Sequence, residues 1–106
     1  MMFTTELLYK NSVGVPTFPQ ARGGQKALFI VNVVTLEGTF PVMGIDIEHK
    51  NLSDGSYTTA ASFDSISTTG VFKKEASGLK QQVRLKLTLS AGTASRVAIL
   101  DPQWSN

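Results

Sequence analysis

Residues 28–36 constrain the fold most, because this segment, Leu-Phe-Ile-Val-Asn-Val-Val-Thr-Leu, is apolar on both faces of an extended strand. Side chains of a strand point alternately to its two sides, so one face carries Leu28, Ile30, Val34 and Leu36. A strand with one face in water alternates apolar with polar residues. An uncovered strand of this composition would aggregate. We therefore expect the N-terminal segment or another copy of the chain to cover the second face. These four residues, or those of the opposite face, are the candidate subunit interface.

The remaining chain contains further strand patterns. Residues 42–49 and 83–90 each alternate apolar with polar side chains, which is typical of strands with one solvated face. Turn residues predict a hairpin over 42–63 and a two-residue hairpin turn at Ala91-Gly92. No segment has a convincing helical period. Seven or eight short antiparallel strands predict one all-β domain over residues 1–106, a β-sandwich of jelly-roll or immunoglobulin-like type.

Two segments lie outside these strands. Residues 10–26 are rich in glycine and proline, and we expect an extended, irregular arm or long loop that either crosses a neighbouring subunit or is mobile. Residues 101–106 follow a strand-ending proline and are expected to form a C-terminal tail. Phe18 and Arg22 of the arm and Trp104 of the tail are the candidates for contact with a neighbouring molecule.

The composition argues against an enzyme. The chain has no cysteine and one histidine, which excludes disulfides, thiolate chemistry and multi-histidine metal sites. Asp46 and Glu48 share a strand face, as a glycosidase pair would, but nothing in the sequence predicts the burial that such a pair needs. We interpret them as solvated charges, and His49 as a structural or exposed histidine. No catalytic residue, metal or cofactor is expected.

The charge pattern gives little support for nucleic-acid or membrane binding. The formal net charge is only +2. Gln82, Arg84, Lys86 and Thr88 would form a polar stripe on one strand face, but no aromatic residue interleaves it. We interpret the stripe as the solvated face of an amphipathic strand. No apolar run reaches the length of about 20 residues that a membrane helix needs, and the N-terminus has no secretory signal pattern.

The spacing of apolar and turn residues over 28–100 resembles that of the head decoration, or cement, proteins of tailed bacteriophages. The segments that carry the resemblance include Leu28–Leu36, Gly38-Thr39-Phe40-Pro41, Ile45–Glu48, Gly78-Leu79-Lys80, Val83-Arg84-Leu85 and Gly92-Thr93. The resemblance implies a β-sandwich, a homotrimer in many members, that binds the major capsid protein and braces the head against the pressure of the packaged DNA. It places the protein on the capsid exterior of the virion after synthesis in the host bacterial cytoplasm. It implies no catalytic residue.

Two alternatives remain open at this point. A tail or baseplate component would have the same composition and a lower copy number. A glycan-binding β-sandwich would use Tyr57, Trp104 and the hydroxyl-rich loop 64–70 to contact sugar.

Overall fold

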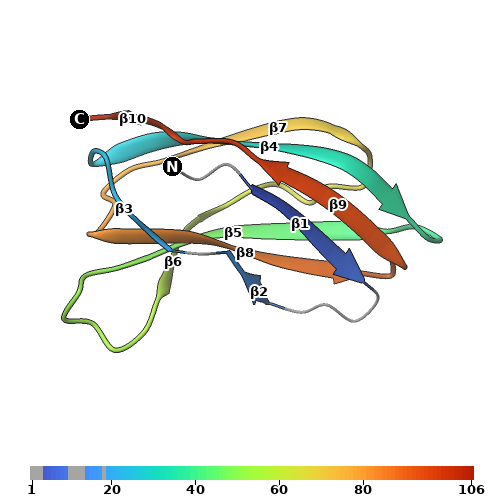
Figure 1. Ribbon diagram of the computed structural model, residues 1–106, viewed down its shortest axis with the longest axis horizontal. Helices are drawn as coiled ribbons and strands as arrows, with labels where there is room; N and C mark the ends of the chain where they lie inside the picture. The colour runs from blue at the N-terminus through green and yellow to red at the C-terminus, as the bar shows by residue number, and fades with distance from the viewer. Residues whose placement is uncertain (1–3, 10–13, 18) are drawn as a thin grey trace.

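The computed structural model describes residues 4–9, 14–17 and 19–106 and places ten β-strands in two stacked antiparallel sheets (Figure 1). The strands are β1 Thr4–Tyr9, β2 Val15–Pro16, β3 Gln20–Ala21, β4 Lys26–Glu37, β5 Val42–Lys50, β6 Thr58–Ser62, β7 Gly70–Ala76, β8 Gln82–Ser90, β9 Ala94–Ile99 and β10 Gln103–Ser105. None of the described residues is helical. The described chain accordingly contains no helix long and apolar enough to cross a membrane.

Each sheet is four strand positions wide. In the first sheet β1 pairs with β9, β9 pairs with β4, and β7 pairs with the other edge of β4. Ala27 pairs with both β7 and β10, and Val31 pairs with both β7 and β9, so β9 and β10 follow one another along a single edge of β4. In the second sheet β2 and β3 likewise share one edge of β8, which continues to β5 and β6.

This strand order is that of a jelly roll. If β2 with β3 and β9 with β10 are each counted as one interrupted strand, every connection between successive strands except β5–β6 passes from one sheet to the other. An immunoglobulin fold instead keeps several consecutive pairs in one sheet. The predicted all-β sandwich is therefore confirmed, and of its two candidate types the topology matches the jelly roll.

The core lies between the sheets and is built from alternate residues of the long strands. The inner face of β4 contributes Phe29, Val31 and Val33, each no more than 1% exposed. The other buried apolar residues are Ala27, Met43, Ile45, Ile47, Phe63, Ile66, Ala76, Leu79, Val83, Leu85, Leu87, Leu89, Val97 and Ile99. The clean alternation over β5 and β8 therefore marked the buried side of the second sheet.

The described part of 10–26 is extended, as expected, but it is not an irregular loop. It forms the interrupted edge of the second sheet against β8 (Figure 1). The Thr17 amide donates to the Leu85 carbonyl over 2.8 Å, and the Leu85 amide donates to the Thr17 hydroxyl over 3.0 Å. Proline is tolerated at a sheet edge, where its missing N–H faces away from the ladder, so the two prolines limited the length of these strands and did not prevent them.

Residues 101–106 are likewise not a tail. β10 pairs with the start of β4, and the Trp104 ring meets the Phe29 ring edge-on, with centroids 6.2 Å apart and planes at 73°. Gly23 lies against the indole, because a Cβ there would be 2.7 Å from Trp104 ring atoms. The expectation was wrong because Pro102 interrupts the edge strand without ending it.

The two predicted hairpins have different outcomes. β5 and β6 pair, which confirms the hairpin over 42–63. β8 and β9 belong to different sheets, so the turn at Ala91-Gly92 connects sheets and does not close a hairpin. The Thr93 amide donates to the Glu37 carbonyl over 2.8 Å, which attaches this turn to the neighbouring turn after β4.

Candidate functional site

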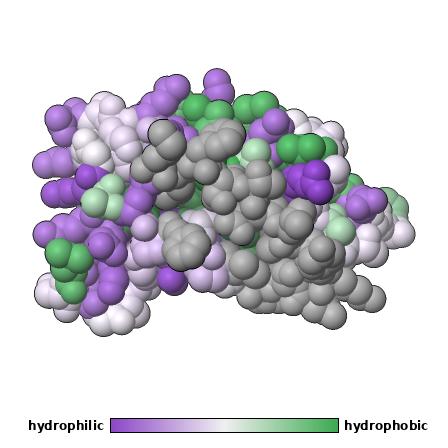
Figure 2. All heavy atoms as spheres, viewed as in Figure 1, coloured by the Kyte–Doolittle hydropathy of each residue, from purple (hydrophilic) through white to green (hydrophobic). Residues whose placement is uncertain are grey.

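The outer face of the first sheet carries apolar side chains that the fold leaves uncovered. Leu28 and Ile30 on β4 are half-buried, while Val34 is 46% and Val71, on β7, is 59% exposed. We call these four residues the β4–β7 face. Strand register places charged residues among them, since Ile30 lies opposite Lys73. Figure 2 shows hydrophobic atoms gathered over β4 and β7 at the top of the view, with hydrophilic atoms between them.

Leu36 does not belong to this face. The register between β4 and β9 shifts between Val33 and Thr35, which marks a β-bulge. One extra residue reverses the alternation beyond it, and Leu36 consequently packs against the core. The sequence-based assignment of Leu36 to the candidate interface is therefore wrong, whereas Leu28, Ile30 and Val34 lie on the outer side. Val71 was not predicted, although its position opposite Asn32 follows from the pairing.

The residues expected to reach a neighbouring molecule are placed differently. The Arg22 guanidinium donates to the Leu79 carbonyl, and the Arg22 amide donates to the Gln81 carbonyl over 3.0 Å. Trp104 packs against its own core. Both are thus held by their own chain. Phe18 lies outside the described residues.

The basic residues of β8 are neutralised by acidic residues of β5. Register places Glu48 opposite Arg84 and Asp46 opposite Lys86. Glu48 lies 2.9 Å from Arg84 Nε and 3.3 Å from Lys86 Nζ, and Lys86 Nζ lies 3.8 Å from Asp46. Glu48 is only 5% exposed, so the interpretation of it as a solvated charge is wrong, whereas Asp46 does reach solvent. Both carboxylates are engaged in ion pairs, and the stripe offers little uncompensated positive charge to an acidic partner.

Tyr57 is part of the same charged face. The Arg84 guanidinium lies 3.9 Å from the centre of the Tyr57 ring, and the Lys50 ammonium lies 5.4 Å from it. The Tyr57 hydroxyl is 3.4 Å from Gln82 Oε1. The ring is therefore engaged in cation–π contacts within its own chain.

His49 connects β5 to the turn before β8. Its Nδ1 accepts a hydrogen bond from the Lys80 amide over 3.2 Å. Burial, together with the Lys80 ammonium, lowers the pKa of His49 below its ordinary 6.5, and the Asp54 carboxylate opposes the shift. Within the described residues no group of three or more His, Cys, Asp or Glu side chains is placed to hold a metal ion.

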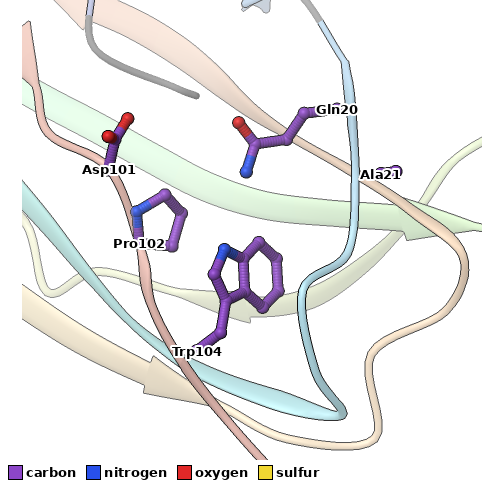
Figure 3. A pocket seen from close by; sticks show the side chains of 5 residues that line it. All are labelled: Gln20, Ala21, Asp101, Pro102 and Trp104. Atoms are coloured by element: carbon purple, nitrogen blue, oxygen red, sulfur yellow. The ribbon is translucent and has the colours of Figure 1, made fainter.

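A pocket of about 390 Å³ lies beside the C-terminal strand (Figure 3). Its lining residues are Gln20, Ala21, Asp101, Pro102 and Trp104. Of these, only Trp104 had been singled out from the sequence. The others escaped notice because the segments now seen as β3 and β10 carry loop-like residues.

Sequence reasoning also missed an exposed aromatic residue. Phe40, in the turn between β4 and β5, is 87% exposed and has a positive φ of 52°. A left-handed conformation is uncommon for a bulky side chain, but the sequence gives no signal of it.

No protein-family model, curated protein or solved structure matches the chain. Function therefore has to be inferred from the chain's own residues.

Proposed function

We propose that this protein is a bacteriophage capsid decoration protein, a homotrimer that binds the outside of the major capsid protein and stabilises the head. The observation that carries the proposal is the β4–β7 face. Isolated exposed apolar residues are ordinary, but neighbouring ones on one sheet face are typical of interaction surfaces. The resemblance in strand and turn spacing supplies the capsid context, and the jelly roll is a fold that capsid proteins use.

In this proposal the β4–β7 face packs between copies. Val34 and Val71 are the most exposed members and lose the most contact with water on assembly. A decoration protein gains its effect from modest contacts repeated by symmetry, because each subunit of the oligomer contributes a binding surface for the capsid. The neutralised face of the second sheet then remains in solvent.

Native mass tests the interface. The chain mass is 11.4 kDa, and we expect the purified protein to sediment at three times this value. Val71→Asp introduces a charge at an exposed position, so the fold should survive while the assembly dissociates to monomers. Leu52→Asp is the matched control, because Leu52 is 66% exposed in the β5–β6 connection, away from the β4–β7 face. A monomeric wild type, or a Val71→Asp variant that keeps the wild-type mass, would contradict the interface.

Copy number tests the role in the virion. Quantitative mass spectrometry of native particles should find this chain in a small integer ratio to the major capsid protein. A handful of copies per particle would instead indicate a tail or baseplate component. Absence from the particles would overturn the proposal of a virion protein altogether.

A further inference from the structure

The pocket beside β10 combines groups that a ligand would have to match. Figure 3 shows the Gln20 amide pointing from β3 toward Pro102 and Trp104. The indole nitrogen faces the same space, and Asp101 lies on the opposite side of the pocket from Gln20. The pocket volume of about 390 Å³ falls in the range of about 300–1,000 Å³ that is usual for small-molecule sites.

The polar atoms of the lining differ in what they can offer to a ligand. Gln20 Oε1 is buried beyond the reach of solvent, and the Gln20 side chain presents its amide nitrogen to the pocket (Figure 3). The amide N–H groups and the indole N–H can donate hydrogen bonds. Asp101, in contrast, is exposed and can accept hydrogen bonds at the rim.

We propose that this pocket binds a single sugar ring of a glycan. The pocket has an acceptor in Asp101 and donors in the Gln20 amide and the Trp104 indole N–H, so its ligand must donate and accept within a small space. Hydroxyl groups do both. Pro102 and Ala21 provide apolar surface for the C–H groups of the ring.

Other ligand classes fit these groups less well. An organic ammonium could contact Asp101 but would leave the indole N–H without an acceptor, since an ammonium only donates. A phosphate or carboxylate would be repelled by Asp101. A peptide would need an extended groove or a free sheet edge, whereas this pocket is a compact one that five of the described residues line.

The single tryptophan of the chain gives a direct readout. In a ¹H–¹⁵N spectrum of the labelled protein, one indole cross-peak reports on the pocket wall. The probes are the methyl glycosides of α-D-glucose, α-D-mannose and β-D-galactose, together with N-acetylglucosamine. We expect at least one of them to shift this cross-peak saturably, and glycerol, which lacks the ring, to leave it in place. Ethylammonium chloride serves as the cation probe.

Two variants and a matched control locate the binding. Gln20→Leu removes the amide donor at similar volume, and Asp101→Ala removes the carboxylate acceptor. Each should weaken binding of the active sugar about tenfold, as expected for the loss of one good hydrogen bond. Asp64→Ala removes an exposed carboxylate that does not line the pocket and should bind as the wild type does.

The outcomes decide the proposal. No saturable shift with any of the four sugars, or a shift saturated by ethylammonium alone, would overturn it. So would wild-type affinity in Asp101→Ala, which alters only an exposed side chain and decides the question even if Gln20→Leu does not fold. The site does not depend on the capsid proposal, because the titration uses the isolated protein and the copy number uses the virion.

Discussion

Replacing Trp104 by alanine tests whether the C-terminal strand is part of the core. A fully buried tryptophan removes about 150–250 Å² from water, which at about 25 cal/mol per Å² corresponds to about 4–6 kcal/mol. Trp104 is only partly buried and packs edge-on against Phe29. We therefore expect about half of this value, or about 2–3 kcal/mol, to be lost from the free energy of unfolding. For a chain of this length such a loss lowers Tm by about 9–13 °C.

The assay is equilibrium urea denaturation followed by far-UV circular dichroism, because the variant lacks the only tryptophan and its fluorescence cannot be used. Trp104→Phe keeps an aromatic ring beside Phe29 and should cost about 1 kcal/mol. Leu52→Ala truncates an exposed side chain and should change stability by less than about 0.5 kcal/mol. If Trp104→Ala also stays within about 0.5 kcal/mol of the wild type, the residues after Pro102 contribute no core packing and the reasoning is refuted.

Two further predictions concern the polar contacts of β5. Arg84→Met should lower the free energy of unfolding, measured by urea denaturation, by about 1–2 kcal/mol, and Lys86→Met by only about 0.5 kcal/mol. The reason is that Arg84 is the closer partner of the buried Glu48 carboxylate, and equal losses in the two variants would contradict it. Because the pKa of His49 is lowered in the folded protein, the unfolded chain binds the proton at a higher pH than the folded chain does. The contribution of His49 to stability is therefore complete above the ordinary pKa of 6.5 and decreases as the pH falls below it. In His49→Asn the new side chain can still accept a hydrogen bond from the Lys80 amide, but it does not titrate near this pH. The urea midpoint of the variant should therefore depend less on pH than that of the wild type between about 8 and about 5.5. The same pH dependence in both proteins would exclude His49 as the cause.

The class of fold could be predicted because it depends on local pattern. Strict alternation over β5 and β8 records which side of each strand is buried, and no segment offers a helical period. The choice between a jelly roll and an immunoglobulin fold depends on which distant strands pair. The turn at Ala91 illustrates the limit, since Ala91 adopts a positive φ of 56° of the kind that tight hairpins use. Its two flanking strands nevertheless enter different sheets.

The candidate interface was predictable only up to the bulge in β4. Three of its four members lie on the outer side, because the alternation from Leu28 onward matches the pleat. A bulge adds one residue without a reliable residue signature, so the inward turn of Leu36 could be seen only in the register with β9. Likewise, the neutral character of the β8 stripe follows from the acids of β5 lying directly opposite, which is again a consequence of pairing.

The pocket was beyond sequence reasoning because it is made by two segments that each look unstructured alone. A short edge strand makes few ladder hydrogen bonds, so it can form in segments whose glycine and proline residues are typical of loops. For this reason the residues of 10–26 and 101–106 did not predict the pairing of β3 and β10. Gly23 is a further reason, because the close approach of its backbone to the indole requires the absence of a side chain. A glycine that the sequence presents as a loop residue is thus what allows Trp104 to dock. Once it docks, the indole fills the end of the core and at the same time forms one wall of the pocket beside Gln20.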